Sequence, residues 1–484
     1  MKRVVIISRK LLKVNTRIFK QAHSLTKAGY HVKAIGIWSE GLKEKEIKDG
    51  YAIWRVKLGS ASFKNIMAPL TNDAFLPAVF SIYKDRRIRE VCIDTYNSIR
   101  DNFRKEVLVK NAKSSKSLRF YWVKVIYNSL RILKMLSLSL GYLCFRFLLY
   151  IYRLFRRLLF CVYKPFHKFF LAFEYWYKVY KICAREKIDI IHANDLDALP
   201  VALLVAKQHR AKLVYDAQEL YTEIHTLTKF DKVILTLQEY IFSRKADKII
   251  AVNEFVAKEM EKRYRINIDE VIINCPPYEE IDITRRNCSD IRDIFKIPFS
   301  IPLLVYSGGL NKKRGIENTI LALKYLSKKA HMVLLGDGPI KKDLEKLAKR
   351  ENLRNRVYFY NYVRHEKVPS FIATATVGIV PYESAGLNHY YASPSKLFHY
   401  IMAGLPVAAS NFPFLRKIVL GNDIGAVFDA SSPQDIARAV DRILYDEVGY
   451  NRFRKNTLEA KKRYCWENEE KRFLKLYEEL ANKA

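Results

Sequence analysis

Short apolar runs alternate along the chain with longer stretches in which apolar residues recur at helical spacing. Apolar runs of this kind predict buried parallel strands, and the amphipathic stretches predict the helices that cover them. The pattern therefore predicts an α/β protein. The predicted strands of the first half are Val4–Ile7, His31–Ile37, Ala52–Val56, Ile188–His192, Lys212–Asp216, Lys248–Val252 and Val271–Ile273. Those of the second half are Leu303–Ser307, His331–Leu335, Val357–Tyr360, Val377–Pro381, Pro406–Ala409 and Gly425–Phe428.

A polar interval rich in proline separates the two series of strands and begins at Cys275-Pro-Pro-Tyr278. Because proline discourages regular structure, we place a domain boundary near residues 276–298. A chain of 484 residues is long enough for two domains that each bury a core. We expect an N-terminal domain over residues 1–285 and a C-terminal domain over residues 286–484, with a final helix, Asn456–Leu480, that packs back on the N-terminal domain.

Polar residues gather where two predicted strands of the N-terminal domain end. The strand that ends at His192 continues into Asn194 and Asp195, and the strand that ends at Asp216 continues into Glu219. Ligands of open α/β sheets bind outside the carboxyl ends of the strands. These carboxylates could bind ligand hydroxyls or accept a proton, although an aspartate here could equally cap the following helix. Two neighbouring strand ends of the same character favour a site.

Candidate anion sites occur in both halves of the chain. Arg17 lies at the start of the first predicted helix, where free N–H groups can hold an anion. In the second half, Gly308 and Gly309 follow a strand and precede Arg314, so the backbone can approach a phosphate that the guanidinium neutralises. The spacing is not that of a P-loop. Gly336 opens a second glycine turn, for which a plain tight turn is the simpler interpretation.

The most informative block lies between the predicted strands Val377–Pro381 and Pro406–Ala409. A polar loop leads to Pro394, which starts a helix whose first turn carries a serine and a lysine. Free N–H groups and that lysine together suit a diphosphate. An ordinary proline-initiated helix with a solvated lysine is the alternative. The candidate residues of this block are Gly386, Leu387, Asn388, Pro394, Ser395, Lys396 and His399.

The chain has a net charge of +35, and much of this charge lies in one segment, Val107–Phe173, which contains no Asp or Glu. Its longest uncharged run, Met135–Phe145, is too short for the roughly 20 apolar residues that a membrane span needs. On a helical projection, one face carries Arg146, Arg153, Arg157 and Lys164, and the other carries Leu148, Ile151, Phe155, Leu158 and Val162.

A helix with one basic and one apolar face lies in the plane of an anionic membrane surface. We therefore expect a basic, aromatic, membrane-associating insert over about residues 113–173. Packing on the domain with solvated basic faces is the alternative. Nucleic acid is the least favoured partner, because the second face of the helix is strongly apolar.

The seven cysteines are scattered and contain no CxxC pair, which argues against a disulfide framework and a zinc site. The apolar run after Met1 is too short for a signal peptide and reads as a buried strand. We expect a cytoplasmic protein that is peripheral on the inner face of the cell membrane.

Taken in order, these blocks resemble the family 4 glycosyltransferases, which are retaining enzymes of the GT-B fold with two Rossmann-like domains facing a central cleft. The resemblance covers nearly the whole chain except the basic insert. It is specific for the family and not for a substrate. It is strongest at Asn15–Val32, Ile191–Glu219, Ala246–Asn274, Ser307–Gly315, Gly336–Pro339 and Ser393–Ser410.

The resemblance implies glycosyl transfer, with retention, from a nucleotide-sugar, and we expect a hexose and a UDP-sugar. The basic insert adds the expectation of a membrane-associated or lipid-linked acceptor in glycan biosynthesis. It implies no cofactor and no required metal. The implied catalytic residues are Asn194, Asp195, Arg314 and Lys396. The implied donor-binding residues are Gly308, Gly309, Arg314, Gly336, Gly386, Leu387, Asn388, Pro394, Ser395, Lys396 and His399. The implied acceptor-binding residues are Arg17, His192, Asn194, Asp195 and Glu219.

The sequence departs from the pattern of the family at four positions. Tyr391 and His399 stand where the family often has an acidic pair, of which the second member usually holds the ribose. Gly309 stands where many members have Arg, and Asn194 stands where many have His. Two other classes of protein therefore stay open: a GT-B-fold nucleotide-sugar epimerase, which needs no acceptor, and a non-catalytic, membrane-bound relative of an active transferase.

Overall fold

The structure is a computed structural model, and it describes residues 2–12, 16–59, 169–281 and 290–482 together with a few residues between positions 129 and 154. The chain divides into two compact units, Met1–Lys57 with Tyr175–Ala484, and Leu58–Glu174. The second unit contains the expected basic insert and begins earlier than the charge pattern indicates. Most of the insert lies outside the described residues, so its faces and its membrane association stay predictions.

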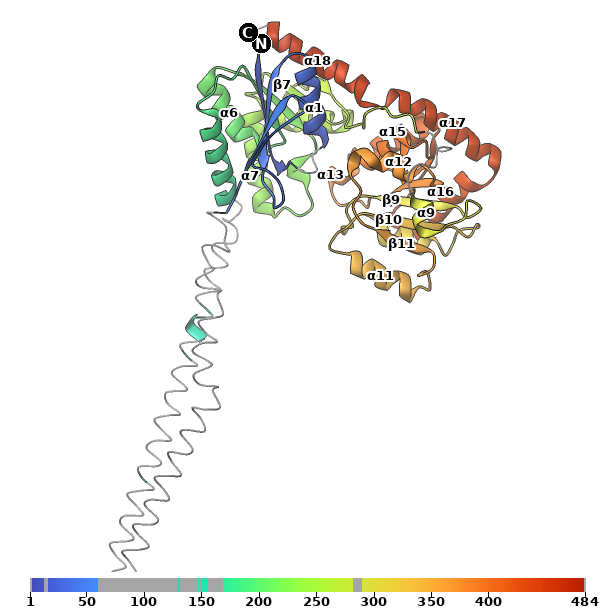
Figure 1. Ribbon diagram of the computed structural model, residues 1–484. Helices are drawn as coiled ribbons and strands as arrows, with labels where there is room; N and C mark the ends of the chain where they lie inside the picture. Colours follow the sequence, from blue (N-terminus) through green and yellow to red (C-terminus); the bar gives the residue numbers. More distant parts are fainter. Residues whose placement is uncertain are drawn as a thin grey trace, which may run out of the picture. The chain divides into compact units, whose positions relative to one another are not determined.

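The N-terminal domain is built on an eight-stranded sheet of order β3-β4-β2-β1-β5-β6-β7-β8 (Figure 1). All neighbours are parallel except the edge pair β3 and β4. The strands are β1 Arg3–Leu11, β2 His31–Ile37, β3 Lys45–Lys48, β4 Tyr51–Val56, β5 Ile190–Asn194, β6 Lys212–Ala217, β7 Lys248–Ala251 and β8 Glu270–Val271. The helices are α1 Thr16–Lys27, α6 Leu199–His209, η2 Tyr221–Glu223, α7 Lys229–Ser243 and α8 Glu254–Tyr264.

The C-terminal domain is built on a six-stranded parallel sheet of order β11-β10-β9-β12-β13-β14. The strands are β9 Leu303–Ser307, β10 His331–Leu335, β11 Val357–Tyr360, β12 Val377–Val380, β13 Val407–Ser410 and β14 Gly425–Phe428. The helices are α9 Ile291–Phe295, α10 Ile316–Ala322, α11 Lys341–Arg350, η3 His365–Lys367, α12 Val368–Ile372, α13 Leu387–Tyr390, α14 Ser395–Met402, α15 Pro413–Gly421 and α16 Pro433–Leu444.

Every strand that the apolar runs predicted is present, because strands buried on both faces read as continuous apolar stretches. The edge strand β3 was missed. Its sequence, Lys-Glu-Ile-Lys, has no apolar run, and it contributes no buried residue. Side-chain caps fix some helix starts in the N-terminal domain: Thr228 forms a capping box at α7, and Asn253 caps α8.

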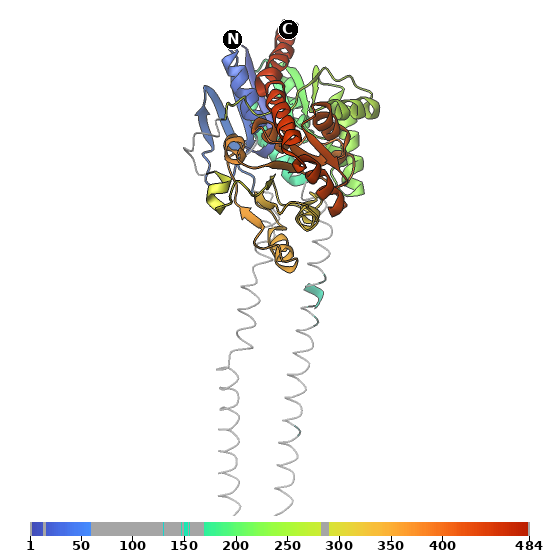
Figure 2. The ribbon, with the colours of Figure 1, turned by 90° about the vertical axis from the view of Figure 1, so that its right-hand side faces the viewer.

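The predicted single helix Asn456–Leu480 is wrong, because two helices occupy this region: α17, Glu447–Arg463, and α18, Trp466–Asn482. Ala460 of α17 lies in a core of the C-terminal domain, whereas α18 packs along α1 on the N-terminal domain (Figure 2). The break at Tyr464 and Cys465 lets the chain pass from one core to the other, and the Trp466 N–H then donates to the Pro276 carbonyl. The α18 residues in the N-terminal core are Trp466, Phe473, Leu476, Tyr477 and Leu480.

Candidate active site

Two glycine turns pack against each other at the carboxyl ends of β9 and β10. Gly308 and Gly336 have φ of +135° and +143°, a region that favours glycine. A Cβ on Gly336 would lie 2.1 Å from the Gly308 carbonyl oxygen, and one on Gly308 would lie 3.2 Å from Lys396 Nζ. The absence of side chains here brings the backbone within reach of a buried lysine, as an anion site requires.

We expect Gly336→Ala to lower the free energy of unfolding by about 2 kcal/mol or more, because the added methyl meets backbone that cannot easily move. Gly421→Ala is the matched control, since a Cβ there meets no atom within 4 Å. Urea denaturation of both variants measures the difference. Equal midpoints for the two would show that the glycine turns are not as tightly packed as described.

Two cations lie over tyrosine rings beside these turns. Lys396, in the first turn of α14, has Nζ 3.4 Å from the centroid of the Tyr306 ring, and the Arg314 guanidinium lies 4.3 Å from that of Tyr382. Burial and the charge of Arg314 lower the pKa of Lys396 well below its ordinary value. Within the described residues, no carboxylate lies within ion-pair distance of either cation. A bound anion would supply the missing counter-charge.

A cavity of about 160 Å³ adjoins Arg314 and is lined by residues of both domains. From the N-terminal domain come Gln218 and Glu219. From the C-terminal domain comes Asn388, whose amide oxygen accepts from the Leu220 N–H at 3.1 Å and whose amide nitrogen donates to Glu219 Oε2 at 3.0 Å. Ser393 also lines the cavity, and its buried Oγ has no hydrogen-bond partner. An unpaired buried hydroxyl and a carboxylate are groups that a polyhydroxylated ligand can satisfy.

Tyr391 does not offer a substitute for the missing acid. Its ring stacks on Phe255 with centroids 6.0 Å apart, and its carbonyl accepts from Asn253 Nδ2 at 2.8 Å. These contacts hold the loop that precedes α14 in the C-terminal domain against the N-terminal domain. His389 of the same loop lies beside Arg314. Burial and that guanidinium lower its pKa to about 4, so its imidazole is neutral near pH 7.

His399 lines a second, larger cavity of about 400 Å³ together with His365 and Ser395. Burial, with the nearby His365, lowers the pKa of His399 to about 3. The imidazole is therefore neutral near pH 7, and its buried Nδ1 has no partner. Such a nitrogen can exchange a hydrogen bond with a hydroxyl, although it cannot replace the charge of a carboxylate.

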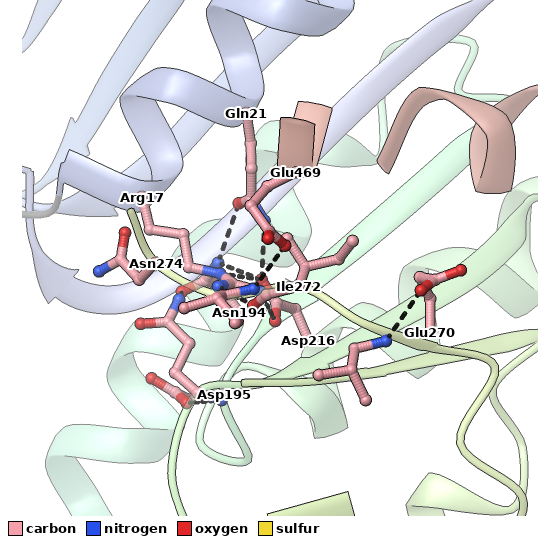
Figure 3. Close-up of polar contacts among 12 residues, drawn as sticks. Arg17, Gln21, Asn194, Asp195, Asp216, Glu270, Ile272, Asn274 and Glu469 are labelled. Carbon is pink, nitrogen blue, oxygen red and sulfur yellow. Dashed lines mark hydrogen bonds and ion pairs between the residues drawn. The ribbon is translucent and has the colours of Figure 1, made fainter. Parts of the chain in front are cut away.

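A fully buried ion pair holds the carboxyl ends of the N-terminal strands together (Figure 3). Arg17 donates to both Asp216 carboxylate oxygens at 2.8 Å and to the Ile272 carbonyl at 2.7 Å, and Gln21 also donates to Asp216 at 2.8 Å. Burial alone would raise the pKa of Asp216, but Arg17 and His192 hold it well below its usual range. The cluster ties together α1, β6 and the segment after β8.

The expected acceptor contacts of Arg17 and His192 are therefore not supported by their positions. Arg17 is 1% exposed and His192 is 0% exposed. His192 has Nδ1 2.8 Å from the Tyr477 hydroxyl and Nε2 3.5 Å from Asp216. Because both side chains are enclosed and engaged with protein groups, we assign them a structural role beneath the site.

Asn194 and Asp195 are also enclosed, at the end of β5. Asn194 accepts from the Gln218 side chain, and Asp195 accepts from the Gln218 N–H at 3.0 Å and forms an ion pair with Lys10. Burial raises the pKa of Asp195, and Lys10 opposes this shift. Of the expected acceptor-binding set, only Glu219 lines the smaller cavity, so Asn194 and Asp195 position Gln218 and Lys10 in this structure.

The sequence interpretation missed Lys10, Gln218, Tyr306 and Tyr382. Ser8 pairs with Asn194 in the sheet, and Lys10 follows Ser8 two residues later. The position of Lys10 at the same sheet edge as Asn194 could therefore have marked it as a site residue. No sequence pattern marked the two tyrosines, because an aromatic residue in or after a buried strand is ordinary core composition.

Two α/β domains, each built on a largely parallel sheet, have the architecture of the GT-B glycosyltransferases. Residues 289–460 match the family described as "Glycosyl transferases group 1", and residues 143–275 match "Glycosyltransferase Family 4". Together the two matches cover the larger part of the chain. The chain therefore belongs to the family 4 glycosyltransferases.

Similar proteins include the alpha-D-kanosaminyltransferase of Streptomyces kanamyceticus, which is 24% identical over 47% of this chain and 59% of its own length. The alpha-monoglucosyldiacylglycerol synthase of Streptococcus pneumoniae is 20% identical over 56% of this chain and 62% of its own length. The chain thus spans about three fifths of the length of these two relatives.

Solved structures share the fold. The sucrose-phosphate synthase of Thermosynechococcus elongatus superposes with a TM-score of 0.66 at 16% identity, with 100% of each chain covered. Anabaena Alr3699/HepE in complex with UDP-glucose superposes with a TM-score of 0.62 at 11% identity, with 99% of this chain and 100% of that chain covered.

Proposed function

We propose that this glycosyltransferase moves a hexose from a nucleotide-sugar, with retention, to a lipid-linked or membrane-associated acceptor in glycan biosynthesis. The observation that carries the proposal is the pair of basic side chains, the half-buried Arg314 and the buried Lys396, which lack a carboxylate partner among the described residues and adjoin the N-terminus of α14. A leaving diphosphate would satisfy both, and its stabilisation is an electrostatic task. The transferred sugar would occupy the cavity of about 160 Å³.

A uridine nucleotide is the donor that we favour. Its support is the structural likeness to a protein solved with UDP-glucose, which bears on the fold and suggests the ligand. The unpaired Nδ1 of His399 would meet a ribose hydroxyl, in place of the acid that the family often has. The described residues contain no group of three or more His, Cys, Asp or Glu that could hold a metal ion. Transfer without a metal is what the family resemblance implies, and it stays a prediction that the assay in EDTA tests.

The proposed acceptor follows from charge and from one relative. The net charge of +35 favours contact with an anionic membrane surface. A similar protein is named for synthesis of a glucosyl diacylglycerol, which is a lipid product. No helix in the described part of the chain is both long and apolar enough to cross a membrane. Peripheral contact at the inner face of the membrane remains the proposed localisation.

The test is a transfer assay with UDP-[¹⁴C]glucose, EDTA and a bacterial lipid extract. We expect UDP release together with radiolabel in the lipid phase. A donor-only reaction is the control, since a nucleotide-sugar epimerase forms product without an acceptor. A new nucleotide-sugar in that control would replace the transferase proposal with the epimerase. UDP, GDP and ADP sugars that all give no product would favour a non-catalytic relative.

We expect Glu219→Gln and Asn388→Ala to weaken the binding of UDP-glucose while leaving the binding of UDP unchanged. Each variant removes a group from the proposed sugar cavity, and one lost hydrogen bond corresponds to about 1 to 1.5 kcal/mol, or roughly tenfold in Kd. Calorimetric titration with each ligand measures the difference. Equal losses for UDP and UDP-glucose would place the sugar elsewhere.

A further inference from the structure

Helix α7, which is labelled in Figure 1, has several exposed apolar residues. A helix on the surface of a globular domain normally turns its apolar stripe toward the core. In α7 five large apolar side chains instead lie on the solvent side, within one arc of a helical projection at 100° per residue, whereas Ile234, Leu235 and Phe242 are half-buried. The exposed fractions are 57% for Phe230, 67% for Val233, 58% for Leu237, 37% for Tyr240 and 45% for Ile241.

Polar residues of α7 point inward and fix the rotation of the helix about its axis. Glu239 is 1% exposed and accepts from the Tyr215 hydroxyl of β6 at 2.6 Å. The Gln238 amide donates to the Leu196 carbonyl at 3.1 Å. A rotation that buried the apolar arc would leave these groups without partners, which is costly. The apolar arc is therefore held outward by the fold.

The exposed charged side chains on and just after α7 are basic, and one of them, Lys232, is paired with Glu223 at 2.7 Å. Asp231 is engaged in the capping box and Glu239 is buried. An apolar strip with a cationic border matches the surface of an anionic bilayer, where side chains enter the acyl boundary and cations meet the headgroups. The basic residues are Lys229, Lys232, Arg244 and Lys245.

We propose that the outward arc of α7 docks on an anionic lipid bilayer, as a contact separate from the basic insert. Helix α7 is joined to segments that carry residues of the candidate site, so the role of this contact in catalysis rests on the proposed function. Gln238 holds α7 to the loop that follows Asp195, and η2 joins α7 to the segment that carries Glu219. A bilayer at α7 would bring the headgroup of a lipid-linked acceptor close to the sugar cavity.

The test uses the full chain and the triple variant Phe230→Ser/Val233→Ser/Leu237→Ser, in which only exposed side chains change. Sedimentation with phosphatidylglycerol vesicles is expected to show at least tenfold weaker binding of the variant. The matched control is Tyr445→Ser/Val448→Ser, two residues of the C-terminal domain that are 82% and 81% exposed, and it is expected to bind like wild type. Amide hydrogen exchange of residues 229–244 is expected to slow when vesicles are added to wild type.

Unchanged vesicle binding by the triple variant, or unchanged exchange in α7, would overturn the docking proposal. A wild-type dimer in light scattering that the triple variant abolishes would also overturn it, because a second copy of the chain would then cover the arc. UDP-glucose titration of the same variants separates the two proposals. Retained donor binding with unchanged vesicle binding would refute the docking site alone, whereas absent donor binding in wild type would refute the proposed function.

Discussion

Arg314→Ala and Lys396→Ala are each expected to lower the rate of UDP release in the transfer reaction by about 10² to 10³. Both cations are placed to stabilise the charge that develops on the leaving diphosphate, and one lost group of this kind costs roughly 3 to 4 kcal/mol in the transition state. Lys312→Ala is the matched control, because Lys312 lies on the same loop and is exposed. We expect it to retain nearly full activity.

The transfer rate is also expected to depend on pH, and to fall as the pH rises. Burial and Arg314 lower the pKa of Lys396, so this lysine loses its proton at a lower pH than an exposed lysine does. The rate is therefore expected to fall on the alkaline side before the ordinary lysine value of about 10.5 is reached. If the wild-type rate stays constant up to that pH, or if Lys396→Ala keeps full activity, then Lys396 does not stabilise the leaving diphosphate.

Asp216→Ala is expected to lower the free energy of unfolding by about 3 to 5 kcal/mol, because it leaves the Arg17 guanidinium buried without a counter-charge. Arg17 and Asp216 are 1% and 0% exposed. The exposed pair of Arg452 and Asp423 provides the control, and Arg452→Ala is expected to change stability by less than about 1 kcal/mol. Urea denaturation near pH 7 measures both.

The stability difference also depends on pH. Arg17 depresses the pKa of Asp216 in the folded state, so the pair contributes fully above the unfolded value of about 3.9 and loses its contribution as the pH falls through the folded value. The gap between wild type and Asp216→Ala is therefore expected to narrow below about pH 4. A gap of under 1 kcal/mol at pH 7 would show that the cluster in Figure 3 does not hold the strand ends together.

The strands could be predicted from the sequence because parallel strands buried on both faces form continuous apolar runs. The break between α17 and α18 could not, because the helical pattern continues on both sides of Cys465 and only the change of packing partner interrupts it. The outward orientation of the apolar arc of α7 could not be predicted from the sequence either. Its spacing is that of any amphipathic helix, and the sequence does not say which side faces the core.

The candidate site was predicted in part. The glycine turns, Arg314 and the start of α14 at Ser395 follow from local patterns that act at short range in the chain. The burial of Arg17 and His192 could not be predicted, because their partners Asp216 and Tyr477 lie far away in the sequence, and their acceptor contacts stay a prediction. A polar residue at a strand end can serve a ligand or a buried network, and only the three-dimensional partner distinguishes the two.

The most direct test of the central claim is a calorimetric titration with UDP, GDP and ADP sugars in EDTA, for wild type and Arg314→Ala. We expect one nucleotide-sugar, a UDP-sugar, to bind wild type and to bind the variant at least tenfold more weakly. No binding of any of the three to wild type would contradict the account, and would leave the chain as a non-catalytic member of its family.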